Sequence, residues 1–124
     1  MDVPVRWVGG NKCPACRIQG EARERHINVF LAWLADEEMR VAFDASPGLC
    51  VPHFLRTLRT AAKPDMRQYL IEIEHRKFAG LLSDLEEFCR KHDYRFSSET
   101  FGKEADSWRR VIQIMVGLPA IMAE

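Results

Sequence analysis

The chain has 124 residues and a formal net charge of zero, with 18 basic and 18 acidic side chains. A chain of this length can bury one hydrophobic core but hardly two, so we expect a single domain over residues 1–124. A neutral protein has no bulk attraction to nucleic acid or to an anionic membrane, and we expect it to bind neither. The sequence has no apolar run of the roughly 18 residues that a membrane-spanning helix needs and no apolar N-terminal signal segment, so we expect a cytoplasmic protein.

The first half of the chain predicts a short extended segment followed by helices. Residues 3–12 are rich in β-branched and aromatic side chains and end in a Gly-Gly-Asn turn, which favours an extended piece. From about Gly20 to Phe43 apolar residues recur at helical spacing, and Asp36 can cap the second part of this stretch. A further helix is expected over residues 52–62, with a proline in its first turn, where a missing N–H costs no hydrogen bond.

The dominant element is expected from about residue 65 to residue 93. Its apolar residues form a stripe that drifts slowly around the helix, which is typical of helices that wrap around a partner. The stripe consists of Met66, Leu70, Ile73, Phe78, Leu81, Leu85 and Phe88. At 1.5 Å per residue this helix would be on the order of 40 Å long. Because that exceeds what a small domain needs, we expect part of it to form the interface of a homodimer.

A last helix is expected to end at Gly117, since a glycine followed closely by Pro119 is typical of a helix C-terminus. Its inward-facing residues are expected to be Ala105, Trp108, Ile112, Met115 and Val116. Together these elements predict an all-α fold, a small helical bundle with one long helix.

Two pairs of candidate metal ligands share one spacing: Cys13 with Cys16, and Cys50 with His53. Two intervening residues allow both side chains to turn onto one ion, and three thiolates with one imidazole suit tetrahedral Zn²⁺. Four protein ligands leave no open coordination position, so such a site would be structural. We therefore expect an N-terminal Cys3His zinc knuckle that ties the opening segment to the 52–62 helix. An iron–sulfur cluster or a redox disulfide is the alternative chemistry for these residues.

A second Cys-x-x-His pair, Cys89 and His92, lies near the end of the long helix. The two residues are one turn apart and could replace Cys50 or His53 as ligands, although Cys89 lies at the edge of the apolar stripe and is more typical of a small packed side chain. His92 is followed by Asp93 and Arg95, and these three residues form a candidate functional cluster. Alternatively, the basic residues here complement the dipole at the helix C-terminus.

Three blocks of sequence stand out together: Cys-Pro-Ala-Cys-Arg from Cys13, Gly-Leu-Cys-x-x-His from Gly48, and the polar stretch from Glu87 to Trp108. With these blocks the chain resembles an uncharacterised prokaryotic family of helical proteins, catalogued as a domain of unknown function. The resemblance covers nearly the whole chain. It implies an all-helical protein with a Cys/Cys/Cys/His metal site, and it brings no activity, substrate or partner.

These observations predict a zinc-binding helical module that acts through interaction or regulation rather than through catalysis. Its partner is expected to be a second copy or another protein. Two alternatives stay open. One is an enzyme or ligand-responsive protein that uses His92, Asp93 and Arg95 between the last two helices. The other is a thiol redox sensor whose metal is released when its ligand thiols are oxidised.

Overall fold

The computed structural model of the chain describes residues 13–117 and contains no strand in this range. The five α-helices are α1 (Pro14–Trp33), α2 (Glu37–Ala45), α3 (Val51–Thr60), α4 (Pro64–Lys91) and α5 (Ser107–Val116). Two short 3₁₀ helices, η2 (Tyr94–Phe96) and η3 (Lys103–Asp106), connect α4 to α5. The prediction of an all-α fold with one long helix is confirmed, whereas the expected extended segment at residues 3–12 lies outside the described residues. Within residues 13–117, every helix is too short or too polar to cross a membrane.

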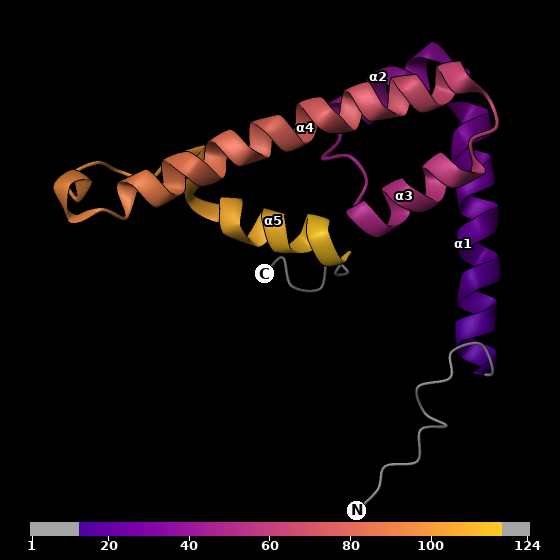
Figure 1. Cartoon of the computed structure of the whole chain (residues 1–124), viewed down its shortest axis with the longest axis horizontal. Helices are drawn as coiled ribbons and strands as arrows, with labels where there is room; N and C mark the ends of the chain where they lie inside the picture. The colour runs from indigo at the N-terminus through magenta and orange to yellow at the C-terminus, as the bar shows by residue number, and fades with distance from the viewer. Residues whose placement is uncertain (1–12, 118–124) are drawn as a thin grey trace, which may run out of the picture.

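The long helix α4 is the spine of the molecule (Figure 1). α2 and α3 lie along its N-terminal half, and α5 runs back beside it toward the start of α3. α1 meets this assembly near the beginning of α4 and extends away from it. The arrangement brings the N-terminus of α3 beside the end of α5, whereas the C-terminal end of α3 meets α1 (Figure 1).

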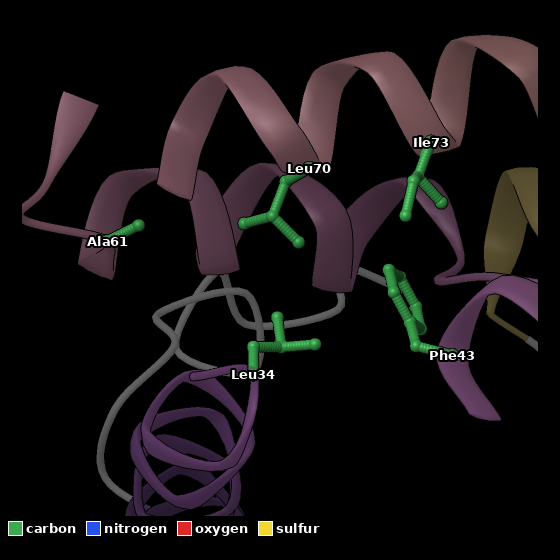
Figure 2. Close-up of a cluster of buried hydrophobic side chains, with 5 residues drawn as sticks. All are labelled: Leu34, Phe43, Ala61, Leu70 and Ile73. Carbon is green, nitrogen blue, oxygen red and sulfur yellow. The ribbon is translucent and has the colours of Figure 1, made fainter. Parts of the chain in front are cut away.

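The hydrophobic core lies where α1, α2 and the first half of α4 meet, as Figure 2 shows. Its buried members are Leu34, Phe43, Ala61, Leu70 and Ile73. Phe30 of α1 packs edge-to-face against Phe43 of α2, with ring centroids 5.1 Å apart. The core therefore secures the N-terminal half of α4, and other interactions must hold its C-terminal half.

The helix boundaries follow local chemistry. α1 begins at Pro14, six residues earlier than expected from Gly20, because Cys13 is an extended N-cap residue and a proline at the first position needs no N–H partner. Asp36 caps a separate helix, α2, and its Oδ1 accepts a hydrogen bond from the N–H of Glu38 at 2.8 Å. α5 ends at Gly117 in a left-handed conformation with φ of 69°, as the sequence predicts.

The orientation of α5 differs from the prediction. The expected inward residues Trp108, Ile112, Met115 and Val116 are between 45% and 58% exposed, and Ala105 is exposed as well. Instead, α5 turns Arg110 toward α4, where the guanidinium pairs with the buried carboxylate of Asp84 at 3.0 Å. This pair, with that of Lys103 and Asp84 at 3.1 Å, supplies the buried carboxylate with cations. Ser107, which is buried, and Val111 and Ile114, which are half-buried, also lie on the inner side of α5.

Candidate metal centre

The first ligand pair lies at the start of α1. Cys13 is the N-cap residue, Cys16 lies in the first turn, and both are exposed. The neighbouring backbone and thiol of Cys16 lower the pKa of the Cys13 thiol. The same contact raises the pKa of Cys16. The pair thus presents one sulfur that favours the thiolate, the form that binds metals, beside a second thiol.

The second pair lies at the start of α3, where Cys50 is the N-cap residue and Pro52 occupies the first turn. The Sγ atom of Cys50 lies 2.9 Å from Nδ1 of His53. The carbonyl of Cys50 accepts the N–H of Phe54 at 2.8 Å, so the turn is helical from its first residue. A sulfur and a nitrogen in contact on one helical turn can bind a single ion with little rearrangement.

Glu74 and Lys77 of α4 hold the loop that leads into this second pair. Glu74 is fully buried, and its Oε1 accepts a hydrogen bond from the N–H of Leu49 at 2.6 Å. Burial raises the pKa of the Glu74 carboxyl. Nζ of Lys77 donates to the carbonyl oxygen of Asp44 in the last turn of α2 and to that of Ser46 in the loop, each at 2.6 Å. Because Leu49 precedes Cys50, the long helix sets the position of the second ligand pair.

Gly48 lets this loop approach α4. Its φ is 90°, in the left-handed region, and a Cβ here would lie 2.7 Å from Cδ of Lys77 and 2.9 Å from Oε1 of Glu74. A side chain would therefore meet both steric strain and two packed neighbours. The Gly48-Leu49-Cys50 sequence thus leads the chain from α2 into α3 while it packs against α4.

α1 and α3 face each other across a groove of about 750 Å³. The groove is lined by Gln19, Ala22, Arg23, His26, Ile27 and Phe30 of α1 and by Leu49, His53, Thr57 and Gly117. Cys16 precedes Gln19 by three residues, and Cys50 precedes His53 by three, so both cysteines continue the faces that border the groove. The helices are joined beside it by an ion pair, with Nη1 of Arg56 2.7 Å from Oε1 of Glu24.

The four predicted ligands form two pairs on facing helices and are not gathered into one cluster. Nowhere in residues 13–117 do three or more His, Cys, Asp or Glu side chains form a group that could hold a metal ion. Each half of the expected ligand set is therefore assembled locally, by a helix N-terminus.

The candidate cluster of His92, Asp93 and Arg95 lies at the opposite end of α4 from α1 (Figure 1). His92 is exposed, and its Nδ1 lies 2.9 Å from the carbonyl oxygen of Phe88, to which it can donate. Its ring packs on Phe88 and Phe101, with centroids 4.2 Å and 5.1 Å away. These contacts cap the C-terminus of α4.

Asp93 and Arg95 make a contact of their own. Oδ1 of Asp93 accepts the N–H of Arg95 at 2.9 Å, and the guanidinium of Arg95 lies 2.7 Å from Oδ2. These bonds lower the pKa of Asp93 and begin η2. Cys89 is exposed, in contrast to the packed position expected for it. The contacts of this region are therefore those of a helix end.

A comparison with protein families covers almost all of the chain. Residues 9–120 match the model of a family of unknown function, DUF6062. The chain belongs to this family. The match includes both ligand pairs and the polar stretch from Glu87 to Trp108, as the resemblance predicted. No curated protein and no solved structure matches the chain.

In this member of the DUF6062 family, two buried polar contacts have no signature in the sequence pattern. Glu74 directly follows the apolar Ile73, and its contact with Leu49 spans 25 positions of the chain. Lys91 and Glu104 form an ion pair at 2.7 Å with side chains only 13% and 6% exposed. The turn signature Ser-Pro-Gly before Leu49 marks the loop, but it does not identify the carboxylate that receives it.

Proposed function

We propose that the protein is a helical binding module whose α1–α3 end is closed by one structural Zn²⁺. The ligands would be Cys13, Cys16, Cys50 and His53. The observation that supports this most is the location of both pairs at N-termini of facing helices, on faces that border one groove. A movement of α1 toward α3 that narrows the groove would bring the pairs together.

The donor atoms suit this role. Soft sulfur and imidazole ligands select zinc over hard cations, and a helix N-terminus favours the thiolate form of a cysteine. Four protein ligands leave no position for water or substrate, so the ion would hold helices together and take no part in a reaction. Structural zinc contributes on the order of 10 kcal/mol or more to the folding of small domains.

α1 also has a reason to need such a link. Ile27 is its one buried residue, out of the 20 that the helix contains. Phe30 and Leu31 pack against the core near the end of α1, so packing secures the C-terminal part of the helix more than its first half. A metal bridge from its first turn to the start of α3 would fix the half of α1 that packing leaves free.

The metal content of the purified protein tests the proposal. We expect one equivalent of zinc per chain in the wild type and in Cys89→Ser, the matched control, because Cys89 is an exposed thiol outside both pairs. Cys13→Ser and Cys50→Ser should each lose most of the metal. Replacement of zinc by Co²⁺ should give the visible absorption of tetrahedral thiolate ligation in the wild type and the control alone.

Four outcomes would contradict this assignment. Zinc that is absent from the wild type, or retained in Cys50→Ser, would remove the proposed ligand set. Brown protein with iron and sulfide would replace zinc with an iron–sulfur cluster. Retention in Cys13→Ser together with loss in Cys50→Ser would limit the site to α3.

A thiol redox sensor is a second candidate, favoured by the contact between the Cys13 and Cys16 thiols. Hydrogen peroxide can oxidise two thiols to one disulfide, with the peroxide reduced to two molecules of water. Formation of that disulfide at low peroxide, with stoichiometric release of zinc, would support the sensor. Metal that stays bound under those conditions would exclude it.

An enzyme that uses His92, Asp93 and Arg95 is the remaining candidate. The contacts of these residues support it less, because each bonds to the end of α4 or to the start of η2. His92→Ala separates the two roles. A pure capping role predicts a modest fall in thermal stability and nothing else, whereas a ligand or second metal that His92→Ala fails to bind would favour the enzyme.

A further inference from the structure

The helix α5 is amphipathic, but its apolar stripe faces outward. Trp108, Ile112, Met115 and Val116 are spaced by four, three and one residues, which places them on one side of the helix. Their exposed fractions are 47%, 45%, 58% and 57%. Helices of a folded domain normally turn such a stripe toward the core, so this surface, which we call the α5 stripe, needs a different explanation.

Rotation of α5 about its own axis, which would bury the α5 stripe, is opposed by the contacts on its inner side. Arg110 pairs with the buried Asp84 at 3.0 Å, Ser107 is fully buried, and Gly117 closely approaches Sγ of Cys50. Turning the α5 stripe inward would move Arg110 into solvent and leave the buried Asp84 with Lys103, at 3.1 Å, in place of two cations, and it would expose Ser107. The α5 stripe must therefore be covered from outside the chain's own described helices, or stay in water.

The size of the α5 stripe fits a binding surface. Four half-exposed side chains of this kind leave on the order of 400 Å² of apolar surface in contact with water, as large as the functional patches of monomeric proteins. Two such stripes packed together would bury roughly 800 Å², and neighbouring residues would bring the total near the about 1,200 Å² at which specific interfaces begin. The interface would be small and the affinity modest.

A second copy of this chain matches the α5 stripe best. The stripe contains no charged side chain, so the surface it recognises is another apolar stripe, and a two-fold axis supplies one of equal length from the same helix. Two copies also approach without repulsion, because the formal net charge is zero. Arg109, beside the stripe, places its guanidinium over the ring of Trp108 at 5.7 Å, so a partner would have to displace it from that ring.

We propose that the α5 stripe is the interface of a homodimer in which α5 packs against its symmetry mate. The expected interface thus moves from the long helix, whose large exposed apolar residues are Ile71 and Leu82, to the last one. This deepens the binding role proposed above by naming the partner, although the contact does not use the metal. A dissociation constant on the order of 10 µM is expected for an interface of this size.

Sedimentation velocity or light scattering across about 2–200 µM protein tests the dimer, with the range set to bracket the expected affinity. The decisive variants are Trp108→Glu and Ile112→Glu, which place a charge in the α5 stripe. The matched control is Trp33→Glu, because Trp33 is 62% exposed on α1. Circular dichroism and the metal content of each variant show that it is folded. We expect the wild type and Trp33→Glu to dimerise. Both stripe variants should stay monomeric over this range, with association constants at least ten-fold lower than that of the wild type.

The results separate this proposal from the metal site. A wild type that is monomeric at the highest concentration, or a dimer that survives both stripe variants, would overturn the interface. Loss of the dimer in Trp33→Glu as well would place the contact on α1 and overturn it too. A zinc-bound monomer refutes the dimer alone, whereas a metal-free dimer that depends on Trp108 refutes the metal site alone.

Discussion

The two ends of the molecule are held together by different means. At the α4–α5 end, Asp84 pairs with Arg110 at 3.0 Å and Lys91 pairs with Glu104 at 2.7 Å, with most of these side chains largely shielded from solvent. At the α1–α3 end, α1 has one buried residue, and a groove of about 750 Å³ separates the helices. The α4–α5 end is therefore held by ion pairs between its own side chains, whereas the α1–α3 end carries three thiols and an imidazole that could bind a metal ion.

The difference indicates which part of the fold would depend on a bound metal ion. Asp84 and Glu104 at the α4–α5 end each have a cation at hydrogen-bond distance, so these buried charges are neutralised within the chain. At the α1–α3 end, the thiols and the imidazole of the two ligand pairs have no cation partner among the described residues, and a metal ion would be the group that joins one pair to the other. Removal of the proposed zinc should therefore loosen one end and spare the other.

Metal removal should produce the largest effect. We expect chelation of zinc to raise amide hydrogen exchange in the first turns of α1 and α3 by about 100-fold, because local opening there would no longer break metal bonds. Exchange in the C-terminal half of α4 should change by less than about three-fold. Hydrogen–deuterium exchange with mass spectrometry measures both, and Cys89→Ser serves as the control. A uniform increase along the chain would mean that the two ends unfold as one unit, contrary to the comparison.

The sequence predicts the helices well because helix formation is local. The α3 and α4 boundaries lie within about two residues of those expected, and Gly117 ends α5 as foreseen. The prediction of which face of α5 is buried was wrong, because apolar periodicity identifies a stripe of residues but does not identify the surface that covers it. Here the inner face of α5 combines the Arg110–Asp84 pair with the buried Ser107 and the half-buried Val111 and Ile114. The ligand pairs were visible as motifs, but their relative placement depends on the packing of α1, which no motif records.

Glycine substitutions should give an intermediate effect and test how α4 positions the second ligand pair. Gly48→Ala should destabilise the protein by about 2 kcal/mol, because φ is 90° and the new methyl would meet Lys77 and Glu74. Gly80→Ala is the control. It lies inside α4 with nothing within 4 Å of its Cβ position, so it should be stabilising by about 0.5–1 kcal/mol. Urea unfolding measures both, and equal effects would contradict the close approach of the loop at Gly48.

The smallest effects concern pH, and they should have opposite signs at two carboxylates. The pKa of Glu104 is lowered from 4.5 to about 2, chiefly by its hydrogen bond from Lys91. Its contribution to stability is therefore complete above about pH 4.5 and is lost as pH falls through about 2. The melting temperature of the wild type should exceed that of Glu104→Gln by about 5 °C at pH 6, and the gap should close toward pH 2. Asp93→Asn, which alters a more exposed ion pair, should show a gap of less than about 1 °C.

Glu74 should behave in the reverse manner, because burial raises its pKa above 4.5. The folded protein then binds a proton at a pH where the unfolded chain has released it, so that acidification from neutral pH stabilises the wild type. The melting temperature of the wild type relative to Glu74→Gln should therefore rise by a few degrees as the pH falls from neutral toward 4.5. The substitution keeps the loop contact, because the amide oxygen of the new side chain can still accept the N–H of Leu49. Parallel pH curves for Glu74→Gln and Glu104→Gln would show that the two carboxylates occupy equivalent environments, which neither the desolvated loop contact of Glu74 nor the ion pair of Glu104 allows.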